Sequence, residues 1–229
     1  MKPPAKAPPR LCGVCVARVP PLFRAPAPES APDLDMRPSE PARSTLDRWI
    51  AVCRACGAAA PDLAALPAEA GEIVRSPAYA DCAGSPETLP FRRWAMLSPT
   101  PDDAADALLQ AAWVAEDAAL DTEAAALRSE AAARWAETKQ LDRACRRLDA
   151  LRRAKDFDAA TTWLTEVRTR PLDEVSAAVV TFQADRIAAR DSARYLMSAA
   201  LRPPAHAPHV SHGKRAPSRG GWFSRLLGR

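Results

Sequence analysis

The chain has 229 residues, of which 48% are hydrophobic, enough for one or two modest domains. Its formal charge of +4 is unevenly divided, because residues 1–28 and 202–229 together carry eleven basic and no acidic side chains, whereas the region between them carries 21 basic and 28 acidic ones. This division argues against a broad nucleic-acid-binding face on the acidic middle region and assigns any attraction for polyanions to the two ends.

The sequence predicts a cytoplasmic protein. No segment contains 18 consecutive apolar residues, so we expect no transmembrane helix. The first residues are rich in proline, and Arg18 interrupts the short apolar stretch that follows, so the apolar core of a secretory signal is missing. In a reducing compartment, cysteines are better suited to holding a metal ion than to forming disulfides.

Two cysteine pairs dominate the N-terminal third. Cys12 and Cys15 are separated by two residues, as are Cys53 and Cys56, and Gly57 follows the second pair. Two such pairs supply the four ligands of a tetrahedral zinc ion, because a two-residue spacing forms a tight turn that directs both sulfurs at one centre. Four thiolates leave no open coordination position, so we expect the zinc to be structural.

The residues around the cysteine pairs favour a zinc-ribbon-like β element over residues 11–66. Apolar, β-prone residues precede or surround each pair, among them Leu11 and the segment 49–52, and they predict two short strands that carry the pairs. The stretch between the pairs, 16–52, is longer than the usual gap of roughly 15–20 residues. We interpret it as a loop insertion that seven prolines stiffen.

Arginines close to the cysteine pairs are consistent with a zinc site, because Arg10, Arg18 and Arg54 would offset the charge of about −2 on a four-thiolate zinc ion. Several alternative functions remain open. Arg10, Arg18 and Arg24 would equally serve a zinc-ribbon nucleic-acid-binding factor, whose affinity would fall with salt. A dithiol oxidoreductase is a third hypothesis, although the βαβ pattern that accompanies thioredoxin-like motifs is not visible in the sequence. Unmetallated thiols are the remaining interpretation.

The rest of the chain is predicted to be helical. No glycine occurs between Gly84 and Gly213, and Pro171 is the only proline between positions 102 and 201. We expect helices near 72–80, 87–97, 102–118, 122–138, 141–155, 157–169, 172–190 and 192–201.

Apolar residues recur at helical spacing in this region, which predicts amphipathic helices that pack side by side. Asp121 and Asp156 begin similar segments 35 residues apart, close to the 34-residue tetratricopeptide period. The sequence therefore predicts a mainly α fold, with an antiparallel tetratricopeptide-like array over 72–201. The four predicted apolar stripes are Ala105, Leu108, Leu109, Ala112 and Trp113; Leu141, Ala144, Cys145, Leu148 and Leu151; Phe157, Ala160, Leu164 and Val167; and Val175, Ala178, Val179 and Phe182.

Short segments spread along the chain carry a resemblance to a known family. They are 33–38, Trp49, 53–57, 60–63, 73–76 with Tyr79, 111–114 with Glu116 and Asp117, 149–154 with Phe157, and Phe182, Gln183 and Ile187. Together they resemble an uncharacterised bacterial family that joins an N-terminal zinc-ribbon-like region to tetratricopeptide-like helices. The resemblance spans roughly residues 11–200 and implies no known reaction.

Other residues that could carry chemistry are better explained by structure. Asp33 and Asp35 could form a carboxylate pair for acid–base catalysis, but no histidine accompanies them, and an Asp-x-Asp flanked by prolines more often makes hydrogen bonds within a turn. Cys145 lies on an apolar stripe and is expected in the core. The role of Cys82 stays open.

The C-terminal region contains two further candidates. Residues 202–219 are predicted to form a flexible linker, in which His206, His209 and His212 lie three residues apart and could bind a metal ion weakly. Residues 220–229 are predicted to form a short basic amphipathic tail. It would dock on a partner protein or an anionic membrane surface through Trp222, Phe223, Leu226 and Leu227.

The sequence therefore predicts a non-enzymatic scaffold or adaptor. Residues 1–10 are expected to be disordered, and a structural zinc site would stabilise the element that follows them. The helical array would bind a protein partner whose identity the sequence does not specify, and nucleic acid is the less favoured partner.

Overall fold

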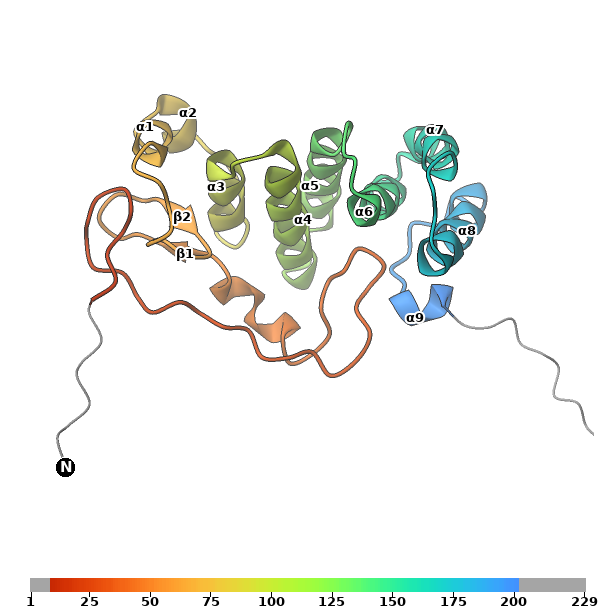
Figure 1. The fold of residues 1–229 in the computed structure, drawn as a ribbon, viewed down its shortest axis with the longest axis horizontal. Coiled ribbons are helices and arrows are strands. Elements are labelled where there is room, and N and C mark those ends of the chain that lie inside the picture. The colour runs from red at the N-terminus through yellow and green to blue at the C-terminus, as the bar shows by residue number, and fades with distance from the viewer. Residues whose placement is uncertain (1–8, 202–229) are drawn as a thin grey trace, which may run out of the picture.

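The computed structural model describes residues 9–201 and is mainly helical (Figure 1). Within residues 9–201 the only strands form a two-stranded antiparallel hairpin, in which Ala51 pairs with Ala60 and Val52 with Ala59. In chain order the elements are the 3-10 helix η1 (Arg43–Arg48), strands β1 (Ala51–Val52) and β2 (Ala59–Ala60), and helices α1 (Ala70–Val74), α2 (Pro77–Ala80), α3 (Leu89–Leu97), α4 (Pro101–Asp117), α5 (Asp121–Arg134), α6 (Leu141–Arg153), α7 (Phe157–Arg168), α8 (Glu174–Ala188) and α9 (Met197–Ala200).

Helices α3 to α8 form a row in which neighbours along the chain pack side by side (Figure 1). Helix α8 contacts both α6 and α7, so the last three long helices of the row pack against one another. One large hydrophobic core follows the row, and a smaller one surrounds the cysteine pairs. Trp94 of α3 packs against both cores and so links the cysteine region to the helices.

Side-chain caps determine where several helices begin. Thr100 accepts a hydrogen bond from the backbone N–H of Asp103, and Pro101 occupies the first turn of α4, where the missing proline N–H costs nothing. Asp156 caps α7 in the same way, and Asp173 caps α8. These caps satisfy backbone donors that the first helical turn leaves without partners.

Three helices end in the same left-handed turn. Ala119, Lys155 and Arg190 follow α4, α6 and α8 and have φ values of 58°, 64° and 49°. After each of them, the next N–H bonds to a carbonyl five residues earlier, at distances of 2.8 to 3.0 Å. The three turns lie 36 and 35 positions apart. Every second helix of the row therefore ends alike, with a period close to the 35 residues that separate Asp121 from Asp156.

Three of the predicted helices differ from the structure. The predicted helix 72–80 is two helices, because Ser76 adopts an extended conformation and caps α2, which Pro77 begins. The predicted helix 122–138 ends at Arg134. Within the predicted helix 192–201 only α9 is helical, because the residues before it run alongside the N-terminal segment, where Leu196 forms a β-bridge with Asp33.

The N-terminal segment up to η1 is mostly irregular and runs along one side of the helical row (Figure 1). Its residues 32–34 are fixed to the far end of the row, because the Leu34 N–H donates to the Tyr195 carbonyl at 3.0 Å and the Met197 N–H donates to the Pro32 carbonyl at 2.8 Å. A segment that the sequence assigned to a loop insertion thus connects the cysteine region with the last helices.

A buried ionic cluster holds this segment against the helices. The Asp35 side chain has no exposed surface, and its Oδ2 accepts hydrogen bonds from Trp113 at 3.0 Å, Arg128 at 2.9 Å and Arg153 at 3.2 Å. Glu116 of α4 pairs with the same two arginines. Asp35 therefore supplies negative charge to arginines of α5 and α6 and accepts a hydrogen bond from α4.

Arg37, two residues after Asp35, completes the ionic cluster. Its buried guanidinium pairs with Glu116 at 2.9 Å and with Asp117, which Arg43 also contacts. The backbone N–H of Arg37 donates to Asp35 Oδ1 at 3.2 Å. The prediction that Asp35 makes a turn hydrogen bond is thus confirmed, and the structure adds its contacts with the helices.

The apolar stripes agree with the structure in three helices and only in part in the fourth. Trp113 is 5% exposed and Cys145 is 8% exposed, so both lie in the core as predicted. The stripe predicted for α8 is wrong at Val175, which is 54% exposed, although Val179 is buried and Phe182 packs against the core. The stripe also omits Val180 and Gln183, which are buried. The Gln183 amide donates to the Cys145 carbonyl at 3.2 Å, so the buried face of α8 contains a polar residue that counting apolar residues omits.

Candidate metal centre

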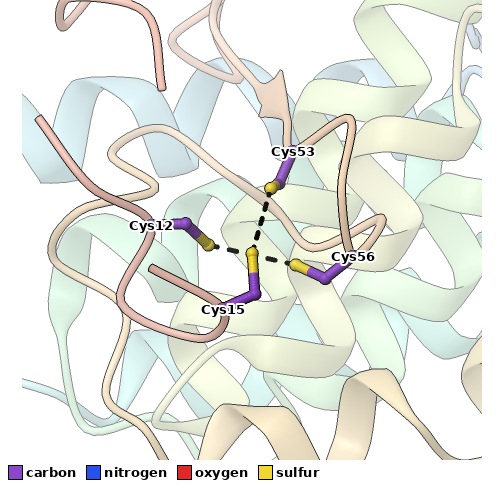
Figure 2. A group of neighbouring side chains, drawn as sticks. All are labelled: Cys12, Cys15, Cys53 and Cys56. Carbon is purple, nitrogen blue, oxygen red and sulfur yellow. Dashed lines mark hydrogen bonds between the residues drawn. The ribbon is translucent and has the colours of Figure 1, made fainter. Parts of the chain in front are cut away.

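The four cysteines of the two pairs lie together and point at one centre (Figure 2). All four sulfurs lie within 4.8 Å of one another, with Cys12 Sγ 3.9 Å from Cys56 Sγ and Cys15 Sγ 3.6 Å from Cys53 Sγ. A tetrahedron with Zn–S bonds of about 2.3 Å has S–S edges of about 3.8 Å. The spacing therefore fits a tetrahedral metal ion and is much longer than the roughly 2.05 Å of a disulfide.

The two cysteine pairs sit on turns of the same design. The Cys12 N–H donates to the Ala17 carbonyl at 2.8 Å, and the Cys53 N–H donates to the Ala58 carbonyl at the same distance, 41 positions further along the chain. Strands β1 and β2 flank the second turn, whereas the first is flanked by a single β-bridge. The prediction of short strands is thus met by a hairpin at the second pair and by a bridge at the first.

A left-handed residue closes each turn. The N–H of Val16 donates to the Cys12 carbonyl at 2.9 Å, and the N–H of Gly57 donates to the Cys53 carbonyl at 2.8 Å. Their φ values are 62° and 77°. Glycine tolerates a positive φ, so this role is expected for Gly57, but the sequence gives no such signal for Val16, because a β-branched residue rarely adopts this conformation. Val16 follows Cys15 as Gly57 follows Cys56, and this matching position was the signal from which the left-handed conformation of Val16 could have been predicted.

Two other residues that the sequence did not single out for this role fix the turns to their surroundings. A Cβ atom on Gly13 would lie 1.8 Å from the Leu66 carbonyl oxygen, so only glycine fits between the first cysteine pair and the chain that follows β2. The buried Tyr79 hydroxyl donates to the Gly57 carbonyl at 3.1 Å and accepts from the Ala59 N–H at 3.0 Å. Helix α2 is thereby attached to the second turn.

The surroundings of the thiols favour ionisation at one position and oppose it at another. Burial works against the Cys53 thiolate, but the backbone N–H groups of Cys56 and Ala55 outweigh it and lower the Cys53 pKa to about 7. Burial raises the pKa of Cys56 to about 12. Four adjacent thiolates also repel one another. A bound dication removes this conflict, because metal ligation deprotonates a coordinating thiol.

Four arginines lie close to the cysteine pairs in the sequence or line the hollows beside them, and one of the four has an acidic partner within residues 9–201. Arg10 pairs with Asp62, which lies in the chain after β2. Arg18, Arg24 and Arg54 are exposed and form no ion pair within residues 9–201. Of the three arginines predicted to compensate the thiolate charge, Arg10 therefore has an acidic partner, and Arg18 and Arg54 have none in this part of the chain.

The remaining candidate residues do not join this cluster. Cys82 is partly buried, and Cys145 lies in the main core, where burial raises its pKa to about 11. The histidines of the predicted linker and the predicted docking residues of the tail lie outside the described residues. Among residues 9–201, the four cysteines are the only group of three or more cysteine, histidine or acidic side chains placed to hold a metal ion.

No family model, no curated protein and no solved structure matches the chain. The resemblance to the bacterial family therefore stays a prediction, and the candidate metal centre rests on the geometry of this chain alone. Within residues 9–201, no helix combines the length and the apolar character needed to cross a bilayer.

Proposed function

We propose that the protein is a non-enzymatic scaffold in which a structural zinc ion, bound by Cys12, Cys15, Cys53 and Cys56, stabilises the N-terminal element against a tetratricopeptide-like helical array. The convergence of four sulfurs from two matched turns is the observation that carries this proposal. Zinc is the metal best suited to four thiolates in tetrahedral geometry. With every position filled by sulfur, the ion has no open site for a substrate or an activated water.

The helical row supports the interaction part of the proposal. Its three left-handed turns recur at nearly the tetratricopeptide period, and its helices pack in sequence order, as helical repeat proteins do. Such arrays bind proteins on extended surfaces. The zinc element would then extend the array at its N-terminal end and present a second surface beside it.

The proposal is tested by replacing one cysteine of the cluster and, as a control, one cysteine outside it. We expect Cys53→Ser to lose the bound zinc and to become sensitive to limited proteolysis between residues 9 and 66, while far-ultraviolet circular dichroism retains most of the helical signal. Cys82→Ser is the matched control, because Cys82 lies outside the cluster, and it should keep both the zinc and the resistance to protease. Turnover of a dithiol substrate by metal-free wild-type protein would instead identify an oxidoreductase.

A further inference from the structure

A slot lies between the two cysteine-bearing segments, beside Cys53. It has a volume of about 480 Å³, and its two walls are the segments 17–20 and 51–55. A second hollow of about 360 Å³ adjoins it and shares Pro20 and Ala51 as lining residues. Both hollows therefore border strand β1 through Ala51.

One wall of the slot is a β edge with unused backbone groups. Cys53 donates its N–H to Ala58, so Val52 and Ala59 form a pair that exchanges no hydrogen bonds across the hairpin. The N–H and C=O of such residues point away from the partner strand. On the far side the Ala59 N–H donates to Tyr79, but the backbone groups of Val52 have no protein partner within residues 9–201.

The opposite wall repeats this arrangement. Around the first cysteine pair, the bonds from Cys12 to Ala17 and from Val19 to Arg10 flank the bridge between Leu11 and Arg18. The backbone groups of Arg18 therefore also point away from their own turn, and in the described part of the chain nothing pairs with them.

Two arginines line the slot beside Cys53. Arg18 and Arg54 line it, both are exposed, and no acidic residue lines it. The adjoining hollow adds Arg24 and Arg48, and its one carboxylate belongs to Asp62, which Arg10 already engages. Residues 1–8 and 202–229 contain no aspartate or glutamate, so the segments outside the described residues offer no acidic side chain to these arginines.

We propose that the slot binds an extended acidic segment of a partner protein, which adds a strand along the free edge of Val52 and lies against Arg18. The inference rests on the proposed scaffold function and specifies the chemistry of one partner. Main-chain hydrogen bonds to the strand edge provide affinity, and alternate acidic side chains of the segment meet Arg18 and Arg54. Val52, 41% exposed, offers an apolar contact to the segment.

A peptide fits these features better than a nucleic acid does. A strand edge offers N–H donors and C=O acceptors in alternation, and a peptide backbone supplies the complement to both, whereas a phosphate backbone accepts only. Bases would need an exposed aromatic surface for stacking. No aromatic residue lines the slot, and Phe23, which lines the adjoining hollow, has the Arg48 guanidinium 4.2 Å from its ring centroid.

The test is fluorescence anisotropy of the full chain with a fluorescein-labelled peptide of alternating glutamate and valine. We expect the double variant Arg18→Glu with Arg54→Glu to weaken binding by about tenfold or more, since each removed ion pair is replaced by repulsion. Val52→Pro should weaken it about as much, because proline removes the outward N–H and is tolerated on an edge strand. The matched control Arg168→Glu changes an exposed arginine on α7 and should alter affinity by less than about twofold.

Three results would overturn the proposal: no binding of the acidic peptide, equal binding of the corresponding lysine–valine peptide, or an unchanged affinity in the double arginine variant. Tighter binding of oligothymidylate, with the same dependence on Arg18 and Arg54, would identify a nucleic-acid surface instead.

Zinc is measured in every preparation, which separates this proposal from the proposed function. Wild-type protein with one zinc per chain and no peptide binding refutes the slot alone. Metal-free protein that binds the peptide through Arg18 and Arg54 supports the slot and refutes the zinc scaffold. If Val52→Pro loses its zinc, the double arginine variant decides, because its two substitutions are at exposed positions outside the four cysteine ligands and its zinc content is measured alongside.

Discussion

Replacing Asp35 by asparagine tests whether the buried ionic cluster holds the N-terminal segment on the helices. Asparagine has nearly the same size, so packing is retained while one negative charge is lost. Arg128 and Arg153 would then share only Glu116, although their side chains are 1% and 7% exposed and cannot be solvated by water instead. The substitution leaves about one buried positive charge without a partner.

The expected cost is about 3–5 kcal/mol of unfolding free energy, the range for removing one member of a buried charge network. With a urea dependence of about 3 kcal/mol per molar, near the upper end for small proteins, the unfolding midpoint falls by about 1–2 M. Asp158→Asn is the control, because the Asp158 side chain is 99% exposed and lies 4.0 Å from Arg190. It should change the unfolding free energy by less than about 0.5 kcal/mol.

The pH dependence of the same variant provides a second readout. Burial works against the Asp35 carboxylate, but Arg128 and Arg153 outweigh it, so the folded-state pKa lies below its usual value. The stabilisation by Asp35 is therefore complete above the unfolded pKa of about 4 and is lost as the pH falls through the lower folded value. The difference between wild type and Asp35→Asn should be constant above about pH 5 and narrow in acid. A urea midpoint within about 0.3 M of wild type at pH 7 would refute the reasoning.

Three further predictions concern the cysteine turns. Gly13→Ala should abolish metal binding or lower its affinity at least tenfold, because the new methyl group meets the Leu66 carbonyl. Competition with a chelator measures this affinity, and an unchanged value would show that the segments around Gly13 and Leu66 can separate at little cost. Val16→Gly should raise the unfolding free energy by about 1 kcal/mol in urea titrations, since it relieves a left-handed valine that is 67% exposed, and a loss of stability would contradict this account. Tyr79→Phe should cost about 1–3 kcal/mol by leaving the buried Ala59 N–H without an acceptor, and a loss below about 0.5 kcal/mol would indicate that water replaces the hydroxyl.

The sequence was most informative where one local rule decides the structure. The two-residue cysteine spacing determines a tight turn, so the four-cysteine cluster could be predicted without knowledge of the fold. The helices between Gly84 and Pro171 follow from periodicity and from the absence of breakers, and the predicted burial of Trp113 and Cys145 is confirmed.

The contacts of the N-terminal segment could not be predicted in this way. Asp35 meets Arg128 and Arg153 across 93 and 118 positions, and no local pattern encodes such a distance. The same segment explains why the predicted helix 192–201 is wrong, because the residues before α9 pair with this segment instead of forming a helix. The buried face of α8 was missed for a related reason: Gln183 is buried because a distant carbonyl accepts its hydrogen bond.

The central claim is that one zinc ion binds per chain through the four cysteines, and elemental analysis of purified wild-type and Cys53→Ser protein tests it most directly. Fully folded wild-type protein should contain about one zinc per chain after dialysis against a weak chelator, and Cys53→Ser should contain almost none. Wild-type protein that is fully folded and free of metal, with the same unfolding midpoint before and after zinc is added, would contradict the account.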